Sequence, residues 1–141
     1  MIDSIKLLDV TEQNAEEIAE HWAIDVKKNK RTTHYQNIKK EKLIIYAVVF
    51  YHNLKKLLVP DDRIEFTHEY FKKYAKKCHD IGLPLQEAIY GLILMRRHMW
   101  LYADFQAIFI DALEHNQAID SIMRIMLMLD YAVYEITQYY L

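Results

Sequence analysis

Glycine and proline are scarce in this chain, and this scarcity constrains its fold more than any other feature of the sequence. The 141 residues include only Pro60, Gly82, Pro84 and Gly91 of these two types. Folds with many strands need frequent turn residues, and phosphate-binding loops need several glycines, so both are excluded. The 52% of hydrophobic residues is enough for one core. We therefore predict an all-α fold, organised as a single helical domain over residues 1–141.

Charge and cysteine content exclude further classes of protein. The 18 basic and 20 acidic residues give a net charge of −2, which argues against a nucleic-acid partner. The longest segment without a charged residue, 43–54, is too short to cross a bilayer, so no membrane partner is expected. We expect no secretory signal, because the N-terminal residues lack a basic region followed by an apolar segment. The one cysteine, Cys78, cannot form an internal disulfide. These features favour the cytoplasm.

Apolar residues recur at helical spacing from end to end, and no segment alternates with a period of two. Thr11 is predicted as the N-cap of the first helix. The helix over 39–59 is apolar on several faces, which predicts a place at the centre of the bundle. The predicted helix over 104–115 could simply continue the one over 84–102. The pattern predicts about five to six helices, over residues 11–31, 39–59, 62–82, 84–102, 104–115 and 119–140.

The last predicted helix has the most regular pattern. Its apolar residues alternate in spacing between three and four, which is typical of a coiled coil: Ile119, Ile122, Met126, Leu129, Val133, Ile136 and Tyr140. A second stripe beside it makes the apolar surface wider than one neighbouring helix would cover: Ile125, Met128, Ala132 and Tyr139. We expect one side to pack within this domain and the other to bind a partner. A homodimer through this helix is the favoured arrangement. Its expected contact residues are Ile122, Met126, Leu129, Val133, Ile136 and Tyr140.

Three patterns could carry metal or cofactor chemistry. Residues 79–82 spell the His-Asp-Ile-Gly motif of HD-type metal phosphohydrolases, but the amphipathic, lysine-rich helix before them favours a simple helix end. Glu65 and His68 form one Glu-x-x-His pair, and a di-iron bundle needs two. Haem would need an axial ligand, for which His52 and His98 are the candidates. We rank all three below a protein without enzymatic activity, cofactor or metal.

Two features of the fourth predicted helix serve no purpose in starting or ending it. Arg96 and Arg97 are adjacent in an apolar helix, so at least one is expected to be partly buried and paired with Asp130 or Glu135. Anion binding is the alternative. Gly91 costs up to about 1 kcal/mol in a helix interior relative to alanine. We expect it to admit another helix or a small ligand, and so to mark a possible cavity.

Residues 74–100 resemble the N-terminal domain of RsbT co-antagonist (RsbR-type) proteins. In that family a helix ends in a Gly-Ile/Val-Pro-Leu turn, and the next helix carries a leucine-rich stretch and an Arg-Arg pair. The positions that carry the resemblance are Gly82, Pro84, Leu85, Arg96, Arg97 and Trp100, with Trp22 as an early tryptophan.

The resemblance implies a sensor or regulatory module of bacterial stress signalling. Such modules usually precede a STAS domain or a histidine kinase, and related sensor domains are dimeric and similar to globins that bind no haem. The sequence stops where an output domain would begin. We therefore expect either an excised domain or a protein that acts alone through its exposed surfaces.

Overall fold

The computed structural model describes residues 5–58, 64–105 and 112–141. The predicted all-α fold is confirmed, because these residues form six α-helices and one 3-10 segment and contain no strand. In chain order the elements are α1 (Ile5–Gln13), α2 (Ala15–Lys28), the 3-10 segment η2 (Thr33–Asn37), α3 (Lys40–Leu57), α4 (Ile64–Asp80), α5 (Leu85–Phe105) and α6 (Ala112–Tyr140).

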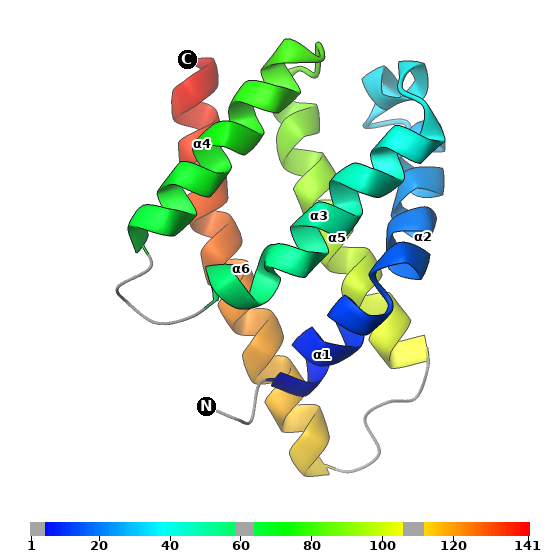
Figure 1. Ribbon diagram of the computed structural model, residues 1–141, viewed down its shortest axis with the longest axis vertical. Coiled ribbons are helices and arrows are strands. Elements are labelled where there is room, and N and C mark those ends of the chain that lie inside the picture. The colour runs from blue at the N-terminus through cyan, green and yellow to red at the C-terminus, as the bar shows by residue number, and fades with distance from the viewer. Residues whose placement is uncertain (1–4, 59–63, 106–111) are drawn as a thin grey trace.

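Two helix pairs, joined by α5, make up the bundle (Figure 1). Helix α2 packs against α3, α4 packs along α6, and α5 contacts both α2 and α6. Burying a large apolar side chain contributes about 1.5–3 kcal/mol, so the shared interior is the main source of stability. All six helices contribute to the most deeply buried side chains, which include Leu7, Ile18, Trp22, Leu43, Tyr51, Leu54, Phe71, Leu94, Met95, Met99, Ile125 and Ile136.

The N-terminal region differs from the prediction. Residues Ile5–Gln13 form a separate helix, and α2 starts at Ala15. Thr11 is not an N-cap, because its buried hydroxyl donates to the carbonyl of Leu7 from within α1 (2.8 Å). Asn14 occupies the N-cap position of α2. A threonine can bond to the carbonyl four residues earlier as readily as it caps a helix, so the local pattern did not separate the two.

The turn between α4 and α5 has the local geometry that its residues predict. Gly82 has a φ of +88°, a left-handed conformation that favours glycine. Its N–H donates to the carbonyl of His79 (3.1 Å), and the N–H of Leu83 donates to that of Cys78 (3.0 Å), which is a Schellman motif. Pro84 was expected as the first helical residue. Instead, α5 begins at Leu85, and Pro84 is the residue directly before the helix.

Helix α3 is not at the centre of the bundle, contrary to the prediction. It is buried on one side only, and its second apolar face is open, with Ile45 60% and Val49 49% exposed. The physical reason is that no described helix covers this face.

The predicted helix over 104–115 lies largely outside the described residues, although α5 extends to Phe105 and α6 begins at Ala112. Pro60 and Asp62, expected at a helix end and a helix start, also lie outside them. No described helix is both long enough and apolar enough to span a membrane.

Candidate functional site

An apolar pocket of about 230 Å³ lies between α3 and α4 and extends inward to α2 and α5. Its exposed lining residues are Val49, Lys73, Lys77 and Ile81, which therefore mark the mouth. Six of its thirteen lining residues are aromatic. The full lining consists of Trp22, Tyr35, Tyr46, Val49, Phe50, Tyr70, Lys73, Tyr74, Lys77, Cys78, Ile81, Leu83 and Met95.

Tyr35, Tyr74 and Cys78 supply the polar atoms of the inner wall. The Tyr74 hydroxyl donates to the carbonyl of Ala88 (3.3 Å), and the Tyr35 hydroxyl makes a long bond to that of Glu87 (3.5 Å). Burial raises the pKa of both phenols well above 10. Burial also raises the pKa of the Cys78 thiol to about 11. All three groups are therefore neutral near pH 7, and the thiol packs in the wall rather than acting as a reactive thiolate.

Two lysines give the mouth of the pocket a positive charge. The ammonium group of Lys77 lies 3.9 Å from the centroid of the Tyr46 ring, a cation–π contact between α4 and α3. Lys73 lies one turn earlier on α4 and is exposed. The positive groups stay at the water boundary, and no carboxylate lines the pocket.

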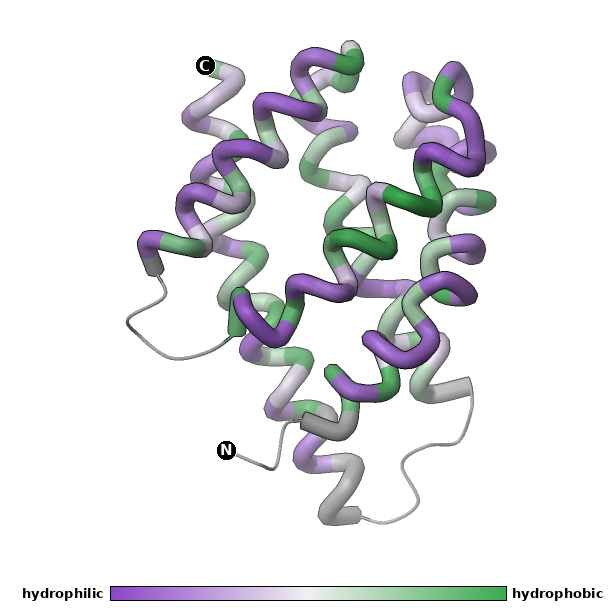
Figure 2. Tube along the Cα trace, viewed as in Figure 1, coloured by the Kyte–Doolittle hydropathy of each residue, from purple (hydrophilic) through white to green (hydrophobic). Residues whose placement is uncertain are grey.

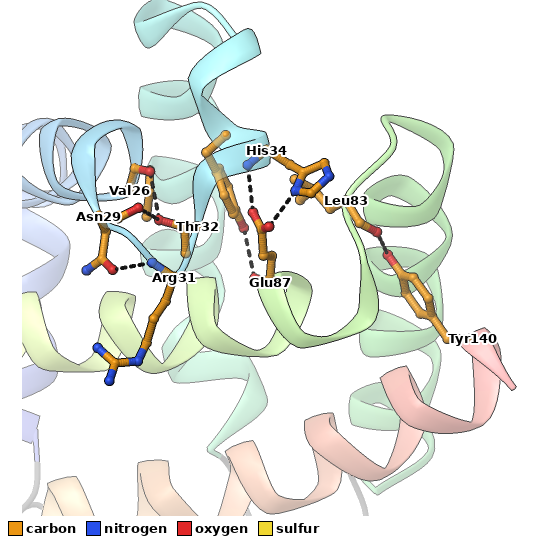
Figure 3. A network of polar contacts seen from close by, with 9 residues as sticks. Val26, Asn29, Arg31, Thr32, His34, Leu83, Glu87 and Tyr140 are labelled. Atoms are coloured by element: carbon orange, nitrogen blue, oxygen red, sulfur yellow. Dashed lines mark hydrogen bonds and ion pairs between the residues drawn. The ribbon is translucent and has the colours of Figure 1, made fainter.

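A polar network fixes the segment that carries Tyr35 (Figure 3). The buried carboxylate of Glu87, in the first turn of α5, accepts from the backbone N–H of His34 (2.9 Å) and contacts His34 Nδ1 (2.5 Å). The Thr32 hydroxyl donates to the carbonyl of Val26 (2.7 Å). These bonds hold η2 to both α2 and α5, and so hold the Tyr35 ring in the pocket wall.

The turn after α4 is tied to the end of α6. The Tyr140 hydroxyl donates to the carbonyl of Leu83 at 2.6 Å (Figure 3). The His79 ring packs edge-on to Tyr139 and Tyr140, with centroids 5.9 and 5.2 Å away. Because Leu83 lines the pocket, the last turn of α6 is in direct contact with the pocket wall.

Gly91 of α5 lies against side chains of α2 and η2. Its carbonyl accepts from Trp22 Nε1 (2.9 Å), and a Cβ atom at this position would lie 2.2 Å from Tyr35 Oη. Trp22 and Tyr35 meet edge to face, with centroids 5.8 Å apart. The Tyr35 hydroxyl therefore occupies the space that Gly91 leaves by having no side chain. Gly91 does not line the pocket, although Trp22 and Tyr35 do.

The histidines considered as haem ligands lie away from the pocket. His52 is exposed on α3. His98 Nε2 contacts Asp25 at 2.7 Å. Neither residue lines the pocket, so neither is placed to ligate a haem there.

The other motifs have structural partners. In the His-Asp-Ile-Gly segment, Asp80 pairs with Lys76 (2.8 Å) at the exposed end of α4. His68 pairs with Glu135 of α6. Within the described part of the chain, no group of three or more His, Cys, Asp or Glu side chains could hold a metal ion.

The expected ion pairs of the two arginines are absent from the described residues. Glu135 pairs with His68 instead, and Asp130 is exposed. Arg96 is partly buried, as expected, and Arg97 is exposed, so neither is buried deeply enough to require a paired acid. Trp100, nearby on α5, is partly buried against the core.

Helix α6 has two apolar faces, and they do not coincide with the predicted stripes. Leu129 and Ile136, expected to face a partner, are 5% and 0% exposed and belong to the core of this chain. Ile122 and Tyr140 are partly buried against it. The correction has a geometric reason. A straight helix drifts about 20° per heptad from a seven-residue repeat, and spacing alone does not tell which face turns inward.

The opposite face of α6 is exposed. Figure 2 shows apolar residues recurring along α6, whereas hydrophilic ones dominate α4. Met123, Leu127 and Tyr134 are 62%, 58% and 57% exposed. We call the exposed apolar residues opposite the core the outer strip, and it consists of Ile119, Met123, Met126, Leu127, Val133 and Tyr134. Tyr131 and Tyr139 are also exposed, but their rings lie beside His68 and His79 of α4.

A scan of family models and searches of curated proteins and of solved structures returned no match to this chain. The resemblance to RsbR-type domains therefore remains a prediction. Sequence reasoning did not find the pocket, because its lining residues span positions 22–95. The available signal was the count of eleven tyrosines, four of which line the pocket: Tyr35, Tyr46, Tyr70 and Tyr74.

Proposed function

We propose that the chain is a non-enzymatic signal-input domain of a bacterial regulatory system, of the stressosome or histidine-kinase type. It acts through dimerisation and contacts with other signalling proteins. The observation that carries the proposal is the outer strip of α6. Support also comes from the sequence resemblance of residues 74–100. A cytoplasmic location and a likeness to globins that bind no haem belong to the same proposal.

The outer strip favours a protein partner because clustered exposed apolar side chains often mark protein interaction sites. From Ile119 to Tyr134 the strip covers 15 helical steps, or about 22 Å. Single exposed apolar side chains are common, but six recur on one face of this helix, on both sides of the exposed Asp130.

A second copy of the chain is the occupant we favour. Two identical strips can meet across a two-fold axis, where any contact between two residues occurs twice, once from each chain. The inner face of α6 is fully used by the core, so association through the strip leaves the fold intact.

Light scattering of purified protein tests this proposal. A dimer of the 17.0 kDa chain has twice that mass. Met123→Glu and Leu127→Glu should convert it to a monomer without changing the circular dichroism spectrum. Ile45→Glu is the matched control, because Ile45 on α3 is 60% exposed and Met123 is 62% exposed. A wild-type monomer, or a dimer that both α6 variants preserve, would exclude the outer strip as the interface.

A further inference from the structure

The pocket between α3 and α4 is not used by the proposed association of α6. We propose that it binds a small, neutral aromatic molecule of one or two fused rings. That this molecule is the input signal rests on the proposed function, whereas its binding to the pocket does not.

The volume of the pocket sets the size of the ligand. Protein interiors are close-packed and contain few voids larger than a water molecule, so about 230 Å³ is a substantial space. An engineered apolar cavity of about 150 Å³ binds benzene in another protein. Sites for drug-sized ligands begin at roughly 300 Å³. The pocket therefore suits a molecule between these sizes, such as indole or naphthalene.

The wall of the pocket favours aromatic ligands. Six aromatic side chains line it, and rings prefer offset or edge-to-face contacts with other rings. The Tyr35 and Tyr74 hydroxyls interact with each other and with backbone carbonyls, so ring contacts rather than a hydrogen bond select the ligand. Indole and naphthalene both present flat aromatic faces to such a wall.

The inner wall of the pocket has no charged group that could balance an ionised ligand, which favours a neutral ligand. An ionised group inside the pocket would lose its hydration, and the inner wall has only the neutral Tyr35, Tyr74 and Cys78 to replace it. Lys73 and Lys77 lie at the mouth, and Lys77 already contacts the Tyr46 ring. An acid would therefore have to leave its charged group at the rim.

The position of Leu83 connects the pocket to the partner surface. Its side chain lines the pocket, and its carbonyl accepts the Tyr140 bond from the last turn of α6. A ligand that displaces Leu83 therefore acts on the helix that carries the outer strip.

Calorimetric titration of the full chain with indole, and separately with naphthalene, tests the inference. We expect binding with a dissociation constant of about 0.1–1 mM, as is common for ligands of this size. Val49→Trp, at the mouth, should weaken binding at least tenfold by filling the pocket. Ile45→Trp is the matched control, because Ile45 is exposed one turn earlier on α3 and does not line the pocket, so it should leave binding unchanged.

Three outcomes would overturn the inference. The first is no binding of either compound near its solubility limit. The second is equal binding by Val49→Trp and wild type, which would place the ligand elsewhere. The third is tight binding of a long-chain acid such as palmitate, lost in Lys73→Ala, without binding of the neutral compounds.

Light scattering measures the mass of the same samples, which separates this inference from the proposed association. Indole binding by a monomer would refute the proposed association and leave this inference standing.

Discussion

Replacing Gly91 by alanine tests whether η2 and α5 approach each other as closely as the structure indicates. The added Cβ would lie 2.2 Å from Tyr35 Oη and 3.1 Å from Tyr35 Cζ. The Tyr35 side chain is 2% exposed, and Glu87 holds the neighbouring backbone, so the ring cannot move away freely. Overpacking of this kind costs about 1–3 kcal/mol, and a displaced hydroxyl loses about 1 kcal/mol more. The helix preference of alanine offsets about 1 kcal/mol. We expect a net loss of about 1–3 kcal/mol in the free energy of unfolding.

Tyr35→Phe supplies the matched background for this test. It removes the atom that the new Cβ would meet at 2.2 Å and leaves the ring carbon at 3.1 Å. This carbon is tight but needs to move by only a few tenths of an ångström. Gly91→Ala should therefore cost at least about 1 kcal/mol less in Tyr35→Phe than in wild type, which is a coupling typical of residues in direct contact.

Urea unfolding, followed by circular dichroism, gives the unfolding free energies of wild type, Gly91→Ala, Tyr35→Phe and the double variant. The protein concentration is held fixed, because association would itself shift the apparent stability. The close approach is refuted if Gly91→Ala is as stable as wild type, or if its cost is the same in both backgrounds.

Three further predictions concern the core and the pocket wall. Leu129→Ala should lower the unfolding free energy by about 2–5 kcal/mol, because Leu129 is 5% exposed. Met126→Ala should change it by less than about 1 kcal/mol, because Met126 is 46% exposed. Equal urea midpoints for the two variants would contradict the assignment of faces on α6. The pKa of Cys78 is raised by burial to about 11, from a reference of 9.0, so the unfolded chain releases this proton first as the pH rises. Stability should therefore fall between pH 9 and 11 in wild type, and more steeply than in Cys78→Ala; parallel stability curves would contradict the buried thiol. Tyr140→Phe removes the bond to the Leu83 carbonyl and should lower the unfolding free energy by about 0.5–1.5 kcal/mol, and an unchanged thermal midpoint would show that this bond is not formed in solution.

Local chemistry in the sequence was sufficient to predict the helical fold and one of its turns. Helical spacing acts over three or four residues, so most helices could be recognised without knowing their neighbours. Gly82 carries the backbone conformation that ends α4, and its two hydrogen bonds join residues at most five apart. Thr11 shows the limit of local reasoning, because the same side chain can cap a helix or bond within one.

Tertiary packing decided the features that bear on function. The regular spacing in α6 was visible in the sequence, but only the packing of α4, α5 and α1 against that helix determined that Leu129 lies inside and Met123 outside. The pocket likewise depends on distant contacts, such as the bond between Trp22 and Gly91, which are 69 residues apart. Sequence patterns report the backbone and the period of each helix, whereas a pocket or a partner surface is the space that remains once the helices have packed together.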